Sequence, residues 1–187
     1  MFGVSLGIMD GAGGAAGGSY ESIASYSLAS DTATVTFSSI ASTYKSIQVR
    51  WLARNTDAIS YTDLNISPNG GGAVTNHKII GNGSSVSATG ATGNGAIYLT
   101  DALVGSTAAA NIFSVGIIDV IDYASTTKNK TFRIFTGQDQ NNSNGSVLLA
   151  SSLATAVGTT ALTSLVFSCS ANFKAGSTFS LYGIKGD

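Results

Sequence analysis

The segment Lys45-Ser-Ile-Gln-Val-Arg-Trp-Leu-Ala-Arg54 alternates apolar and polar side chains along most of its length. Successive side chains of a β-strand point to opposite faces, so this period of two predicts a strand with one buried and one solvent-facing side. The buried set would be Ile47, Val49, Trp51 and Ala53, and the exposed set would be Gln48, Arg50 and Arg54. Because Trp51 shares its face with aliphatic side chains, we expect it in the core.

The same alternation continues on both sides of this segment. In Thr32–Phe37, Ala33, Val35 and Phe37 alternate with threonines, as in a strand with one wet face. Short strands separated by evenly spaced turns are typical of an antiparallel β-sandwich or barrel, so we predict an all-β fold of about ten strands. The other candidate strands are Tyr20–Leu28, Tyr61–Ile66, Ala96–Thr100, Ile112–Tyr123, Thr131–Thr136, Val147–Ser151, Leu162–Cys169 and Phe179–Ile184.

Helix is disfavoured by composition, because serine and threonine side chains compete for helical hydrogen bonds. Asp101–Ala110 is the one candidate helix, but Gly105 in its middle costs about 1 kcal/mol relative to alanine. We predict a loop or a single turn there. Tight polar turns are predicted where glycine and asparagine cluster, at Asn69–Gly72, Gly81–Ser85, Thr89–Gly95 and Gln138–Gly145.

Residues 1–19 differ from the rest in composition. The apolar side chains Phe2, Val4, Leu6, Ile8 and Met9 are followed by a glycine- and alanine-rich stretch from Gly11 to Ser19. Such a stretch buries too little surface to offset the entropy of ordering its backbone. We therefore predict an N-terminal anchoring arm over residues 1–19, with a flexible linker, and a single sandwich domain over residues 20–187. The arm lacks a basic region and an uninterrupted apolar run, so we do not expect a signal peptide.

Charge is scarce in this chain. Nine Lys+Arg and ten Asp+Glu give a formal net charge of −1, and 10% of the residues are charged. A nucleic-acid binder needs a clustered positive patch, and a spanning helix needs about 18 uninterrupted apolar residues. We expect neither nucleic acid nor a membrane as a partner.

Single copies of cysteine and histidine limit the possible chemistry. Cys169 lies in an apolar run and is predicted to be a small buried hydrophobe, while His77 is predicted at a strand edge or in a hydrogen bond. These two residues cannot supply the His/Cys ligand set of a zinc site. Asp139, the one carboxylate within the polar stretch Gln138–Asn144, makes a calcium site there a weak alternative. We expect no cofactor and no metal.

The sequence does not indicate a catalytic site. Asp119 and Asp122 are three positions apart, which on a regular strand places them on opposite faces, so they cannot flank one glycosidic bond. We expect them to accept hydrogen bonds from loop donors or from Arg133 or Lys130. A Ser/His triad is also disfavoured, because no G-x-S-x-G elbow surrounds a serine.

The remaining interpretation is a structural or recognition surface. Hydroxyl and amide side chains suit contacts with carbohydrate, and exposed aromatic rings could stack on sugar rings. Apart from Trp51, the aromatic candidates are Tyr44, Tyr61, Tyr98 and Tyr123.

Five segments give the chain a likeness to known proteins from Tyr20 to the end. They are Tyr20-Glu-Ser-Ile-Ala24, Phe37-Ser-Ser-Ile-Ala-Ser-Thr-Tyr-Lys-Ser-Ile-Gln-Val-Arg50, Ile80-Gly-Asn-Gly-Ser84, Ile118-Asp-Val-Ile-Asp-Tyr123 and Phe179-Ser-Leu-Tyr-Gly-Ile-Lys-Gly186. In their order these segments resemble a family of virion structural proteins of tailed bacteriophages. The resemblance implies a jelly-roll-like β-sandwich, usually a homotrimer, attached to the particle by its N-terminal arm. It implies no catalytic residues.

We therefore expect a non-enzymatic virion protein, made in the bacterial cytoplasm. The first hypothesis is a capsid decoration (cement) protein on the head surface, whose arm contacts the major capsid protein or another virion protein. The alternative is a receptor-binding tail or head-fibre domain that recognises host glycans.

Overall fold

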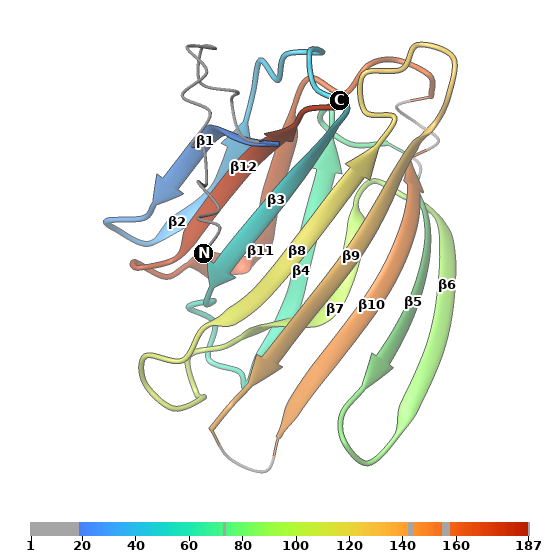
Figure 1. Cartoon of the computed structure of the whole chain (residues 1–187). Helices are drawn as coiled ribbons and strands as arrows, with labels where there is room; N and C mark the ends of the chain where they lie inside the picture. The colour runs from blue at the N-terminus through green and yellow to red at the C-terminus, as the bar shows by residue number, and fades with distance from the viewer. Residues whose placement is uncertain (1–18, 73, 142–143, 155–157, 187) are drawn as a thin grey trace, which may run out of the picture.

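A computed structural model of the chain describes residues 19–72, 74–141, 144–154 and 158–186. In these residues the structure has twelve β-strands, joined by turns and loops (Figure 1). The strands are β1 Tyr20–Ser27, β2 Thr32–Phe37, β3 Ser46–Ala53, β4 Tyr61–Pro68, β5 Val74–Gly81, β6 Val86–Asn94, β7 Ile97–Val104, β8 Ser114–Ile121, β9 Lys130–Asp139, β10 Gly145–Ala154, β11 Leu165–Phe173 and β12 Thr178–Ile184.

The strands form two sheets that pack face to face as a β-sandwich, with antiparallel pairing throughout both sheets. The larger sheet has the order β1-β12-β3-β8-β9-β10-β5-β6, and the smaller has the order β2-β11-β4-β7. In Figure 1 the larger sheet faces the reader and the smaller sheet lies behind it. The predicted all-β sandwich is confirmed.

The connectivity is that of a jelly roll with two added hairpins. Without β5–β6 and β9–β10, the two sheets reduce to β1-β12-β3-β8 and β2-β11-β4-β7. These are two four-stranded sheets between which the chain crosses repeatedly, the arrangement of an eight-stranded jelly roll. Both added hairpins lie beyond β8 and widen the larger sheet on that side only (Figure 1).

The core lies between the inner faces of the two sheets. Ile47, Val49, Trp51 and Ala53 are all buried, as their period predicts. Gln48, predicted in the exposed set, is only 4% exposed, because its amide packs on the outer face against its hydrogen-bond partners Asp119 and Arg50. Phe167 from the smaller sheet packs against Phe179 from the larger sheet, with ring centroids 5.4 Å apart. Val35 and Phe37 of β2 are buried as predicted, and the neighbouring Ala33 is exposed.

Two strands were not predicted. β5 covers a segment that was not assigned to a strand, and β6 includes Thr89–Gly95 almost entirely, which was predicted as a tight turn. β6 is the edge strand of the larger sheet, and its described residues from Val86 to Gly90 are all exposed. Because these described side chains contribute nothing to the core, this part of the strand is under no constraint to alternate apolar and polar residues.

Two further predictions are wrong. Asp101–Val104 continues β7 rather than forming a loop or turn, because its backbone pairs with β4 across a bulge. Arg54 was placed on the solvent face but is only 4% exposed. It lies one residue past β3, where the chain leaves the sheet, so the alternation no longer decides which way its side chain points.

The turns at Asn69–Gly72 and Gly81–Ser85 are confirmed. Asn69 and Gly70 have φ angles of 47° and 84°, the left-handed region that asparagine and glycine tolerate best. Asn82 Oδ1 accepts hydrogen bonds from the backbone N–H groups of Ser84 and Ser85 at 3.0 and 2.8 Å. This asparagine holds the turn between β5 and β6.

Candidate functional site on the outer face of the larger sheet

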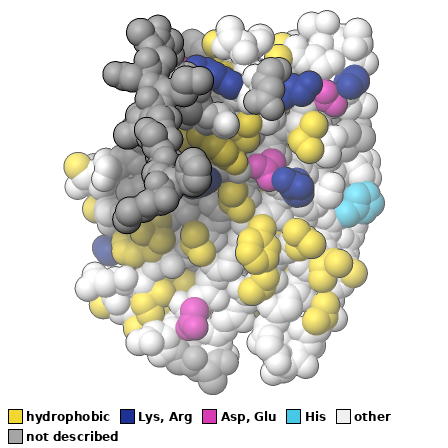
Figure 2. All heavy atoms as spheres, in the orientation of Figure 1, with side chains coloured by type: hydrophobic (Ala, Val, Ile, Leu, Met, Phe, Trp, Pro, Cys, Tyr) yellow, Lys and Arg dark blue, Asp and Glu magenta, His cyan; other side chains and the backbone are white. Residues whose placement is uncertain are grey.

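The outer face of the larger sheet carries large apolar side chains that no other part of the described structure covers. We call them the outer apolar patch. They come from β3, β8, β9, β10 and β5, and each is between 43 and 58% exposed: Leu52, Val115, Phe135, Val147, Leu149 and Ile79. In Figure 2, hydrophobic side chains gather over the centre and lower part of this face. Large contiguous exposed apolar patches are typical of contact sites.

The register of the strands makes the patch continuous. Ile117, Phe135, Leu149 and Ile79 are direct cross-strand partners on four successive strands, β8, β9, β10 and β5. A second line of partners runs through Leu52, Val115, Gly137 and Val147. Side chains directly opposite each other on neighbouring strands have Cβ atoms about 5 Å apart, so the first line forms an unbroken apolar ridge. Gly137, which has no side chain, interrupts the second line between Val115 and Val147.

A polar row runs beside the patch. Gln48, Asp119 and Arg133 are cross-strand partners on β3, β8 and β9. Gln48 Nε2 donates to Asp119 Oδ1 at 2.7 Å, and Arg133 Nη2 donates to Asp119 Oδ2 at 2.8 Å. The row continues to Arg50, whose Nε donates to Gln48 Oε1 at 2.8 Å.

Two tyrosines hold the Arg50 guanidinium in place. Its central carbon lies 5.7 Å from the ring centre of Tyr20 and 5.3 Å from that of Tyr182, both within the range of a cation–π contact. The three residues come from adjoining strands, β1, β12 and β3. This end of the outer face is therefore polar and aromatic, whereas the other end is aliphatic.

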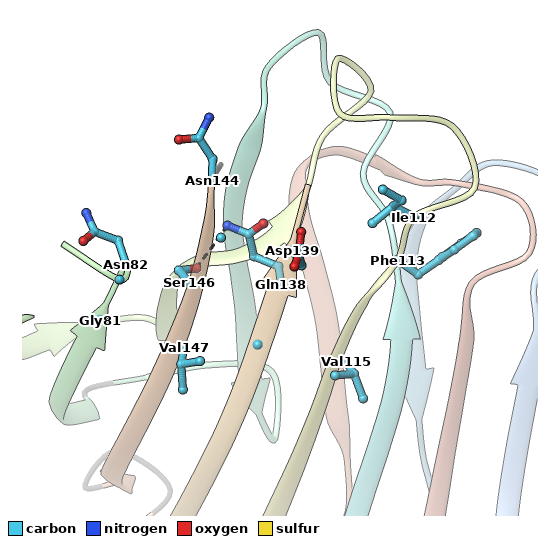
Figure 3. Close-up of a pocket in the computed structure, with 13 residues that line it drawn as sticks. Gly81, Asn82, Ile112, Phe113, Val115, Gln138, Asp139, Asn144, Ser146 and Val147 are labelled. Atoms are coloured by element: carbon cyan, nitrogen blue, oxygen red, sulfur yellow. Dashed lines mark hydrogen bonds between the residues drawn. The ribbon is translucent and has the colours of Figure 1, made fainter. Parts of the chain in front are cut away.

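A hollow of about 570 Å³ lies at one end of the patch, where β9, β10 and the β5–β6 turn meet (Figure 3). Its apolar side is formed by Ile112, Phe113 and the patch residues Val115 and Val147. Its polar side is formed by the amides Asn82, Gln138 and Asn144 together with Asp139 and Ser146. The hollow can thus contact a ligand through both apolar and hydrogen-bonding groups.

The predicted catalytic alternatives do not assemble into a site. Asp119 is bound to Arg133, while Asp122 lies after the end of β8 and pairs with Lys128 Nζ at 3.3 Å. Lys130 was a possible partner of these carboxylates, but it is fully buried and its ammonium donates to backbone carbonyls, including that of Lys128 at 2.7 Å. Burial lowers the pKa of this ammonium.

The two single-copy residues lie far from each other in the fold. His77 is exposed on the outer face of β5, one strand from the sheet edge. Cys169 lies on β11 of the smaller sheet and is partly rather than fully buried, and burial raises the pKa of its thiol to about 11. A thiol with this pKa is almost entirely protonated at neutral pH, so it is a poor nucleophile. Within the described ranges, no three His, Cys, Asp or Glu side chains come together to hold a metal ion.

Of the aromatic candidates, Tyr61 and Tyr98 are exposed, whereas Tyr123 is fully buried and donates its hydroxyl to the Ala41 carbonyl at 2.6 Å. The arm residues Phe2, Val4, Leu6, Ile8 and Met9 lie outside the described residues. The described part of the chain contains no helix that could cross a membrane.

Two features of the structure were not predicted from the sequence. Arg54 donates to four carbonyls of the loop between β7 and β8, including Ala109 at 2.6 Å and Ala108 at 2.8 Å, and burial lowers its pKa. It ties that loop to the end of β3. The second feature is the outer apolar patch, for which a signal was present: doubled apolar pairs such as Ile79-Ile80 and Leu148-Leu149 place one residue on each face of a strand.

Comparisons with known proteins find no relative. No family model, no curated protein and no solved structure matches this chain.

Proposed function

We propose that this protein is a non-enzymatic structural protein that works by protein–protein contact through the outer face of its larger sheet. The observation that carries the proposal is the outer apolar patch. The core is complete without these side chains, so the fold does not require them to be apolar. Completing the burial of one half-exposed aliphatic or phenyl side chain contributes about 1 kcal/mol.

Among non-enzymatic structural proteins, a virion protein of a tailed phage is favoured by the resemblance of five sequence segments to that family. We propose a decoration protein of the capsid surface that forms a homotrimer. The jelly roll is a fold of viral capsid and lectin domains, which supports the proposal by analogy of fold. Closing copies about a symmetry axis would cover apolar faces and exposed sheet edges such as β6.

The oligomer is tested by sedimentation equilibrium of the full chain. We expect a trimer at micromolar concentration. The double variant Phe135→Ser/Leu149→Ser should dissociate at that concentration, while Tyr98→Ser, an exposed aromatic change on the other sheet, should leave the trimer intact. A stable wild-type monomer would contradict the proposed trimer.

The place in the particle is tested by copy number. A quantitative gel of purified particles should give enough copies of this chain to cover the head. A few copies located at the tail would instead support the alternative, a receptor-binding fibre or tail domain.

The attachment role proposed for residues 1–19 is tested by deleting residues 2–18. The strands begin at Tyr20, so the shortened chain should fold and form the same oligomer. It should fail to remain on particles, because Phe2, Val4, Leu6, Ile8 and Met9 would no longer bind the partner. Normal retention on the particle would contradict anchoring, and loss of the oligomer would assign the arm to assembly instead.

A further inference from the structure

The two sheets end in four edge strands: β1 and β6 in the larger sheet, and β2 and β7 in the smaller (Figure 1). The outward side of an edge strand carries N–H and C=O groups that no neighbouring strand pairs, so a strand of another chain can add to it. Proteins usually protect such edges with bulges, charged side chains, proline or groups that cover the backbone. Three of the four edges are protected in one of these ways.

On the larger sheet, the edge formed by β1 is protected by charge and by an irregular backbone. Glu21 is the second residue of this strand, and its Oε2 lies 2.7 Å from Lys185 Nζ. The register with β12 shifts between Ser22 and Ala24, which marks a bulge. A bulge disrupts the regular ladder that an incoming strand needs, and an ion pair loses its hydration when a strand covers it.

On the smaller sheet, side chains from other strands bind a carbonyl of each edge strand. For β7, Asn76 Nδ2 donates to the Tyr98 carbonyl at 2.8 Å, and Lys78 Nζ donates to the same oxygen at 3.4 Å. For β2, the Tyr26 hydroxyl donates to the Thr36 carbonyl at 3.0 Å. An added strand would have to displace these side chains from the acceptors that they already occupy.

The edge formed by β6 is open instead. Its segment Val86–Thr92 contains neither a charged residue nor proline, and it pairs with β5 in a regular register, with the one shift beyond Thr92. The residues from Val86 to Gly90 are all exposed. Val86, at 74%, is the most exposed large apolar side chain of the described residues. This strand is therefore accessible to a second strand along its edge and on both faces.

The segment Val86–Thr92 is suited to pairing with a second copy of itself. Antiparallel pairing of two identical strands requires a two-fold axis. When that axis passes through Thr89, the whole regular segment overlaps, and Val86 of each copy lies opposite Thr92 of the other. The segment carries no charge, so like charges do not meet across the axis. The pairing also covers the exposed Val86.

We propose that β6 pairs antiparallel with β6 of a second copy across a two-fold axis, which joins two eight-stranded sheets edge to edge. A three-fold ring cannot pair a strand with its own copy, so this contact links chains of different trimers, and in that respect the inference rests on the proposed function. The outer apolar patches of the two chains then face the same side of one continuous sheet. Pairing of a single strand buries a small area, so the contact is weak and forms at high local concentration.

Cysteine cross-linking of the full chain tests the position of the axis. In a Cys169→Ser background, Thr89→Cys places two thiols directly opposite each other, at a distance that a disulfide can span. We expect a covalent dimer after oxidation at high protein concentration. The matched control Ser87→Cys lies two residues away, and its two thiols would be about 14 Å apart along the strands. It should give no covalent dimer on a non-reducing gel.

Charge substitution at two exposed positions tests the same pairing without a cross-link. Val86→Lys/Thr92→Lys places two ammonium groups opposite each other on both sides of the axis, whereas Val86→Lys/Thr92→Glu places an ammonium opposite a carboxylate. In sedimentation from micromolar to millimolar concentration, the wild type should associate further as the concentration rises. The first variant should weaken this association about fivefold or more, and the second should restore it.

Absence of a covalent dimer from Thr89→Cys would overturn the proposal, as would equal association by the wild type and both charge variants. If deletion of residues 2–18 abolished the cross-link, the edge would be assigned to the arm of a neighbouring copy, which would also overturn it. Failure of the proposed trimer is distinguishable. A chain that is monomeric at micromolar concentration would contradict the trimer, but through β6 it would still form a dimer at higher concentration and still give the cross-link.

Discussion

The outer face of the larger sheet has two halves that share one inner core but differ in their surface. Over β1, β12 and most of β3 the outer face is polar and aromatic, with Arg50 held between Tyr20 and Tyr182. Leu52, near the end of β3, belongs to the outer apolar patch. Over β8, β9, β10 and β5 it is largely aliphatic, with half-exposed side chains such as Leu149 and Ile79. Both halves contribute buried side chains to the core, such as Val49 of β3 and Ile134 of β9, so the core alone does not explain the difference outside. The aliphatic half is therefore the surface to which the proposed protein–protein contact is assigned.

Most of the aliphatic half comes from the hairpins added to the jelly roll. β9, β10 and β5 supply Phe135, Val147, Leu149 and Ile79, while the eight jelly-roll strands supply Leu52, Val115 and Ile117. The hairpins widen the sheet and also enlarge the apolar surface. An insertion that only extended the fold would have no physical reason to be apolar on both faces.

The largest expected loss of stability comes from a buried phenylalanine of β9, in comparison with an exposed one on the same strand. Phe132 and Phe135 both lie on β9, but Phe132 is fully buried and Phe135 is 53% exposed. Phe132→Ala should lower the free energy of unfolding by about 3–5 kcal/mol, through lost burial and the cavity that remains. Phe135→Ala should lower it by about 1 kcal/mol or less in the same urea titration. Equal losses would mean that the outer face is part of the core.

A smaller loss of stability is expected from a methyl group added on the inner face. A Cβ on Gly116 of β8 would lie 1.9 Å from the ring of Trp51, its cross-strand partner. Gly116→Ala should therefore destabilise the protein by about 1–3 kcal/mol through overpacking. The double variant Gly116→Ala/Trp51→Phe should recover part of this loss, since the smaller ring leaves room. Additive effects of the two changes in thermal unfolding would argue against direct contact.

The patch itself is expected to affect association more than folding. Phe135→Ser/Leu149→Ser removes two half-exposed apolar side chains, each worth about 1 kcal/mol if a partner buries it fully. The dissociation constant of the oligomer should rise by tenfold or more, while the melting temperature measured at low concentration should change little. Tyr182→Ser, an aromatic change on the polar half, is the matched control. Equal weakening by both variants would show that the contact is not confined to the aliphatic half.

The smallest effect is expected in the polar row. Arg133 makes an exposed ion pair with Asp119, and its own side chain is 67% exposed. Exposed pairs contribute about 0–1 kcal/mol and are screened by salt. Arg133→Gln should lower stability by less than about 1 kcal/mol at low salt, and the difference should shrink further at high salt. A large, salt-independent loss would show that the row supports the fold.

Much of the fold could be predicted because burial has a local signature. The alternation in Lys45–Arg54 correctly placed Trp51 and its neighbours in the core. β6 could not be predicted in this way, because an edge strand covered on neither face carries no alternation. Arg54 was misplaced for a related reason: the alternation holds only while the chain stays in the sheet, and β3 ends at Ala53.

The candidate sites could not be predicted from the sequence, because each is formed by residues from segments that lie far apart in the chain. The sequence places Gln138 and Gln140 in one polar loop with a calcium site as an alternative, and it makes Tyr61 a candidate for stacking on a sugar ring. They line one cavity because β4 and β9 belong to different sheets whose ends meet there. The arm residues predicted to bind a partner lie outside the described residues, so that prediction depends on the truncation experiment.

The sequence by itself determined that the chain is all-β and that the alternate apolar side chains from Ile47 to Ala53 form one buried face, because a strand alternates every two residues wherever it lies. Only the tertiary structure decided the order of the strands, which brings Tyr20 beside Ile184 and sets both added hairpins on one side of β8. That order depends on pairing between segments far apart in the chain. The tertiary structure also decided which of the two apolar faces the smaller sheet covers, and so which one stays exposed.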